Sequence, residues 1–161
     1  LRNAATLAIE PVKIGETRIR VTVENTGAGH SIPTGVGDLR QVWLAVVVLD
    51  NTGKELFASG LLAPNRHLPE TAVAFRTILG DGRGNPVINL ARAREILSDT
   101  RIKAGERVTT TFELPGKLPG GSRITARLLY RSMPRKILDM VPGKAFAPLP
   151  VIEMARAETG L

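Results

Sequence analysis

The longest apolar run of the chain lies within residues 41–50, which read Gln41-Val42-Trp43-Leu44-Ala45-Val46-Val47-Val48-Leu49-Asp50. No polar residue interrupts it, which is typical of a strand covered on both faces. A bilayer span needs about 20 apolar residues, so the run is too short to cross a membrane. We therefore expect a buried central strand, with Trp43 as its anchor and the odd- and even-numbered side chains on opposite faces.

Shorter strands are predicted on both sides of this run. Asp50-Asn51-Thr52-Gly53 is a turn sequence that leads back into a strand over residues 54–59. Apolar and polar residues alternate in three segments, the pattern of strands with one buried face: residues 17–24, 107–114 and 123–130. Three further strands are predicted over residues 5–9, 72–79 and 151–155.

Two short helices are expected to interrupt the strands. Asn89 is a good N-cap for a helix over residues 90–97, in which Leu90, Ala93 and Leu97 share one face. Pro134 fits the first turn of a second helix that ends near residue 140. Seven or eight short strands with so little helix predict an all-β fold, an immunoglobulin-like antiparallel β-sandwich. A length of 161 residues is suited to a single domain, residues 1–161.

The composition limits the chemistry of the chain. Twenty-two basic residues against 15 acidic ones give a net charge of +7, which favours an anionic partner: nucleic acid, an acidic protein, a membrane surface or a haem propionate. Aromatic residues make up only 4% and no basic run occurs, so nucleic acid is disfavoured. The absence of cysteine excludes disulfides, thiolate metal sites and covalent haem attachment within the chain. The chain begins at Leu1, and we expect a processed product or part of a larger protein.

A glycine-rich loop between two predicted strands presents one of the two histidines. It reads Asn25-Thr26-Gly27-Ala28-Gly29-His30-Ser31-Ile32-Pro33-Thr34-Gly35. An imidazole in such a loop can ligate a metal or a haem iron through one nitrogen, while a backbone carbonyl holds the other. A loop histidine bonded only to backbone or solvent fits the spacing as well. The second histidine, His67, has no partner at helical spacing and is predicted to be a surface loop residue.

The loop, together with Leu39-Arg40-Gln41-Val42-Trp43-Leu44, resembles a known family pattern, G-H-x-x-P-T-G followed by L-R-Q-x-W-L. This pattern occurs in the C-terminal immunoglobulin-like β-sandwich domain of multihaem c-type cytochromes of the periplasm or cell surface. The segments 96–102 and 128–132 also match the family's layout. The resemblance, which extends over nearly the whole chain, implies that the sandwich packs on haems and that His30 is an axial ligand of a haem iron. Arg40 is the candidate partner of a carboxylate or a haem propionate.

The chain departs from that family because it contains no C-x-x-C-H motif. Any haem c contacting His30 must be held by an upstream segment or a partner chain, and the chain alone is expected to be colourless. The resemblance thus implies a non-catalytic domain of an electron-transfer multihaem cytochrome, periplasmic or extracellular, with a haem-bearing segment or subunit as its partner. The alternative is a cofactor-free structural or adhesion module of a secreted or cell-surface assembly. A third hypothesis is a basic sandwich that binds an anionic polymer.

Overall fold

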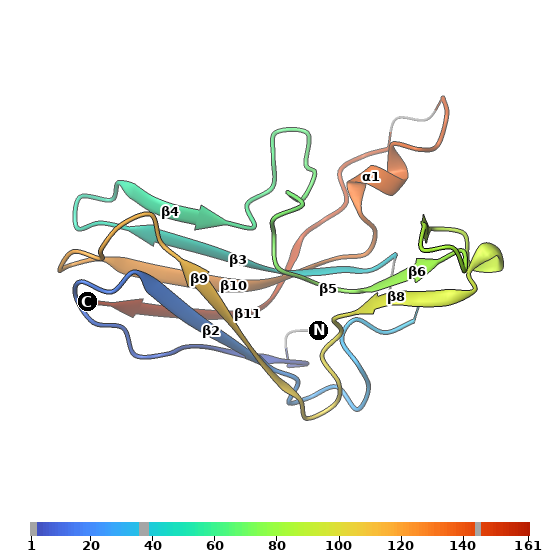
Figure 1. Cartoon of the computed structure of the whole chain (residues 1–161). Helices are drawn as coiled ribbons and strands as arrows, with labels where there is room; N and C mark the ends of the chain where they lie inside the picture. The colour runs from blue at the N-terminus through green and yellow to red at the C-terminus, as the bar shows by residue number, and fades with distance from the viewer. Residues whose placement is uncertain (1–2, 36–38, 144–145) are drawn as a thin grey trace.

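The computed structural model describes residues 3–35, 39–143 and 146–161, and their strands form three antiparallel sheets. The first sheet has the order β1 (Thr6–Ile9), β2 (Arg18–Glu24), β9 (Arg107–Glu113). The second has the order β11 (Ile152–Gly160), β10 (Arg123–Arg131), β3 (Gln41–Leu49), β4 (Glu55–Ser59), and β5 (Ala74–Phe75) also pairs with β3. The third has the order β7 (Pro86–Val87), β6 (Thr77–Gly80), β8 (Glu95–Asp99). Figure 1 shows the first two sheets as layers and the third at one end of them.

Strand β3 is the central strand that the apolar run predicts. It pairs antiparallel with β10 along its whole length, from Gln41 opposite Arg131 to Leu49 opposite Arg123. Its other edge pairs with β5 and then with β4. Both faces are buried, with Val47 as the partly exposed exception among the interior positions. The tight turn into β4 is also confirmed, because the Asp50 carboxylate accepts hydrogen bonds from the amides of Thr52 and Lys54.

The main core lies between the first sheet (β1, β2, β9) and the five-stranded second sheet. The even-numbered apolar residues of β3 meet the inward-facing residues of the neighbouring strands, which are Ile19, Val21 and Val23 of β2, Phe112 of β9, Ile124, Ala126 and Leu128 of β10, and Met154 of β11. Fully burying an aliphatic side chain of this size stabilises a fold by roughly 1.5–3 kcal/mol. This arrangement confirms the predicted all-β antiparallel sandwich.

A second, smaller core covers the outer face of the five-stranded sheet. Trp43, Ala45 and Leu129 are buried there, under partly buried residues from outside β3 and β10: Leu62, Leu68, Ala74 and Val151. The Trp43 indole N–H donates a hydrogen bond of 2.9 Å to the carbonyl of Gly60. The 60–74 connection therefore buries the outer face, which explains why β3 has no polar alternation.

The helix predicted over residues 90–97 is wrong. Asn89 does cap a turn, accepting from the amide of Ala91, but the turn is the three-residue 3-10 helix η1 (Leu90–Arg92). The following residues form β8 instead, paired with β6. Leu90 and Leu97 are 52% and 37% exposed, so the apolar stripe has no surface to pack on. The stability of a helix this short is marginal unless its apolar face packs on another element. Pairing with β6 instead gives the backbone amides and carbonyls of β8 hydrogen-bond partners.

Three other boundaries differ from the sequence-based expectation. The strand predicted over residues 72–79 is split at Arg76, where the chain leaves β3 as β5 and enters the third sheet as β6. Helix α1 (Arg135–Leu138) begins after Pro134 as expected but ends two residues early. Strand β11 continues five residues beyond the predicted end at Ala155. In the described part of the chain, no helix is long and apolar enough to cross a membrane.

Candidate functional site

The loop that carries His30 is anchored by one buried side chain. Asn25, 1% exposed, follows β2 directly. Its amide nitrogen donates to the carbonyls of His30, at 2.8 Å, and Ile102, at 3.0 Å. Its side-chain oxygen accepts from the amide of Ala28 at 3.2 Å. One asparagine therefore joins three points of the backbone and fixes the curvature of the loop.

Two further contacts hold the loop on either side of His30. Ile32 forms an antiparallel bridge to Ile102, with reciprocal backbone hydrogen bonds of 2.8 and 2.9 Å, and both side chains are buried. On the other side, Gly27 approaches the N-terminal segment so closely that a Cβ there would lie 1.8 Å from the carbonyl oxygen of Asn3. The loop thus needs glycine for close approach at position 27.

His30 itself is exposed to solvent. Its Nδ1 lies 3.1 Å from the carbonyl oxygen of Ser31. A carbonyl only accepts hydrogen bonds, so this contact requires the proton on Nδ1, and of the two neutral tautomers it selects the one whose lone pair is on Nε2. No hydrogen bond among the described residues involves Nε2. A backbone carbonyl holding one nitrogen while the other is free is the arrangement found in ligating histidines.

Arg40 directly precedes β3, and its guanidinium donates to the carbonyl of Ser132 at 2.8 Å. Within the described residues no ion pair involves Arg40, and no hydrogen bond joins it to His30. The expected carboxylate or propionate partner of Arg40 therefore stays a prediction. The structure places the two candidate residues on either side of residues 36–38, which lie outside the described residues.

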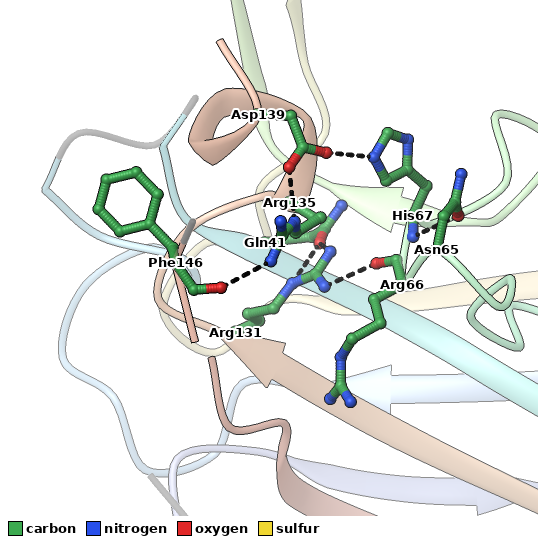
Figure 2. Close-up of polar contacts among 8 residues, drawn as sticks. All are labelled: Gln41, Asn65, Arg66, His67, Arg131, Arg135, Asp139 and Phe146. Atoms are coloured by element: carbon green, nitrogen blue, oxygen red, sulfur yellow. Dashed lines mark hydrogen bonds and ion pairs between the residues drawn. The ribbon is translucent and has the colours of Figure 1, made fainter. Parts of the chain in front are cut away.

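A polar cluster near α1 brings together residues that sequence reasoning did not connect (Figure 2). His67 Nε2 lies 2.7 Å from one carboxylate oxygen of Asp139, and Arg135 Nε donates to the other at 2.6 Å. The hydrogen bond from His67, followed by that from Arg135, holds the pKa of Asp139 below its usual value. His67 is therefore a partly exposed loop residue bonded to Asp139, the C-cap that directly follows α1. No local pattern reveals a contact across 72 positions.

Arg131, at the end of β10, is the other residue that the sequence analysis missed. It is 2% exposed, and its guanidinium carbon lies 5.8 Å from the centroid of the Trp43 ring. The guanidinium donates to the Gln41 side-chain oxygen and, at 2.8 Å, to the carbonyl of Arg66 (Figure 2). Burial, followed by the charges of Arg66 and Arg135, lowers the pKa of Arg131. One sequence signal could have indicated that Arg131 is buried. It lies two residues after Leu129, so both side chains are on the same face of β10, the face that the smaller core covers.

A separate ion pair at the end of β8 predicts a pH dependence of stability. Arg101 donates to both carboxylate oxygens of Asp99, at 2.8 and 2.6 Å, and lowers its pKa from 3.8 to about 2. A carboxyl with a depressed pKa stabilises the fold above its unfolded-state value and loses that contribution as the pH falls through about 2. Because the carboxylate is partly solvent-screened, we expect Asp99→Asn to lower the free energy of unfolding by only about 1 kcal/mol at neutral pH.

Urea unfolding of both proteins between pH 7 and pH 2 measures this difference, which should shrink below pH 4. Glu70→Gln is the control, because the side chain of Glu70 is 95% exposed and 3.8 Å from its nearest cation. An Asp99→Asn variant whose deficit persists unchanged at pH 2 would contradict the assignment.

Comparison with known proteins identifies a shared fold. No protein-family model matches the chain, and no curated protein matches it at a significant level. Among solved structures, a penta-heme cytochrome c552 from Thermochromatium tepidum superposes with a TM-score of 0.72 and 20% sequence identity. The match covers 98% of this chain and 39% of that chain. The chain therefore has the same β-sandwich fold as a portion of that cytochrome, and it spans well under half of that protein's length.

Proposed function

We propose that residues 1–161 form one non-catalytic, immunoglobulin-like domain of an electron-transfer multihaem cytochrome. The observation that carries this proposal is the likeness of the whole sandwich to a part of a penta-heme cytochrome. In that setting the domain packs on haems held by an upstream segment or a partner chain, in the periplasm or at the cell surface. The basic excess of the chain suits contact with haem propionates.

His30 is the proposed axial ligand of one haem iron. The loop fits this role because Nε2 is available at an exposed position while Ser31 holds Nδ1 and Asn25 fixes the backbone. The chain has no cysteine, so the thioether bonds of a haem c come from outside it. When bound, the haem supplies the one-electron chemistry. The chain would contribute an oriented imidazole, and Arg40 is the proposed partner of a propionate.

Replacing His30 by alanine in the assembled cytochrome tests the proposal. Loss of an imidazole ligand should convert one low-spin haem into a high-spin or differently ligated form with a changed reduction potential. The sandwich should stay folded, because His30 is exposed and contributes no core. Electron paramagnetic resonance and visible absorption of the assembled protein measure the change.

His67→Ala is the matched control, since it removes the second histidine and leaves the loop intact. We expect its haem spectrum to equal that of the unmodified protein. An unchanged spectrum in His30→Ala, or the same change in both variants, would refute the ligand role. A cofactor-free structural module is then the better explanation of the loop.

A further inference from the structure

A cleft with a volume of about 660 Å³ opens over the start of β3. Its walls are the segment 67–76, which precedes and includes β5, and the segment 131–136, which leads into α1. Four basic side chains line it, namely Arg76, Arg131, Arg135 and Lys136, together with one carboxylate, Glu70. The lining residues thus carry an excess of positive charge, whatever the protonation state of His67.

Arg131 lies at the base of this cleft, and none of the described residues pairs with it as an acidic partner. Its described hydrogen-bond acceptors are the Gln41 amide oxygen and the carbonyl of Arg66, both uncharged. These contacts use three N–H donors, fewer than a guanidinium carries. A buried charge is costly unless an opposite charge compensates it. The lowered pKa of Arg131 has the same origin, burial and the positive charges nearby.

The other cations around the cleft are only partly neutralised. Arg135 pairs with Asp139, which also bonds His67. Lys136 lies 3.8 Å from Glu70, and both side chains are largely exposed, so this pair is weak. No ion pair among the described residues involves Arg76. Counting Asp139 with Glu70, and Arg66 with the four lining cations, the neighbourhood holds five cations against two carboxylates.

We propose that this cleft is a binding site for an oxyanion, a carboxylate or phosphate group that pairs with Arg131 at its base and with Arg76 and Lys136 at its rim. A planar guanidinium recognises both groups through paired N–H donors, which makes arginine the usual residue for such sites. The site is independent of the His30 loop and needs no haem in the chain. The anion supplies the opposite charge that the buried guanidinium lacks.

The test is a titration of the whole 161-residue chain with inorganic phosphate and, separately, with succinate, at constant ionic strength maintained with chloride. Trp43 is the single tryptophan and contacts Arg131, so its fluorescence reports on the base of the cleft. We expect a saturable fluorescence change and a rise in the unfolding temperature with at least one anion, since a ligand of the native state stabilises it. A stronger response to succinate identifies a carboxylate ligand, and a stronger response to phosphate identifies a phosphate ligand.

Three variants separate a specific site from general charge effects. Arg131→Gln should abolish the response, and because it also alters a buried network, the rim variant Arg76→Gln/Lys136→Gln provides an independent test. The rim variant should raise the dissociation constant about tenfold. Lys54→Gln removes one exposed charge in the turn before β4 and should leave binding unchanged. Equal responses to the anions and to chloride, or an unchanged dissociation constant in the rim variant, would overturn the proposal without bearing on His30.

Discussion

Replacing Trp43 by alanine is expected to lower the free energy of unfolding by about 3–5 kcal/mol. Trp43 is fully buried on the outer face of β3, where it packs in the smaller core with Ala45 and Leu129. Truncation leaves a cavity under the 60–74 connection and removes the hydrogen bond to Gly60. Arg131 also loses the ring on which its guanidinium lies. Urea denaturation followed by circular dichroism measures the loss.

Trp43→Phe is the control for this prediction, because it keeps most of the apolar volume and removes the indole N–H. It should cost about 1–2 kcal/mol, the cost of leaving the Gly60 carbonyl without its donor. If the alanine variant were no less stable than the phenylalanine variant, the outer face of the sheet would not be a packed core. The base of the anion cleft would then lack the support that we assign to Trp43.

Replacing Asn25 by alanine is expected to cost about 2–3 kcal/mol and to loosen the loop that carries His30. The change leaves the carbonyls of His30 and Ile102 and the amide of Ala28 without their side-chain partner. The carbonyl of Ile102 keeps its hydrogen bond from the Ile32 amide, so the cost comes from the loss of three side-chain hydrogen bonds and from the space left by a buried side chain. Amide hydrogen exchange should rise in residues 26–32 before it rises in β3. On the proposal that His30 ligates a haem iron, the assembled protein should also contain a mixture of ligated and unligated haem where the parent protein shows one form.

Two substitutions control for the chemistry of Asn25. Asn25→Asp keeps an acceptor for Ala28 but directs a carboxylate at two carbonyl oxygens, so it should destabilise the protein at least as much as alanine at neutral pH. Asn51→Ala removes an exposed asparagine from the turn before β4 and should change stability by less than about 0.5 kcal/mol. Equal stabilities of Asn25→Ala and Asn51→Ala would refute the anchoring role of Asn25.

The short-range pattern of the chain predicted most of the sandwich. Residues 41–50 predicted the buried central strand, because eight consecutive apolar residues are typical of a strand covered on both faces. Alternation predicted β2, β9 and β10, since the side chains of a strand point to opposite faces in turn. The glycines and the proline of residues 25–35 predicted a loop around His30. These features depend on neighbours in the sequence, which is why they could be read without the structure.

Long-range contacts determined the rest. Residues 90–97 have a helical apolar stripe, yet residues 95–99 form β8 because β6 offers backbone partners and no surface covers the stripe. Asn25 became the anchor of the His30 loop through Ile102, which lies 77 positions away. The basic cleft arises because β10 places Arg131 beside Gln41 and Trp43, while the segments 67–76 and 131–136 close over it. Whether a charge is buried and which strands pair depend on contacts between segments far apart in the sequence. A local sequence pattern does not specify those contacts.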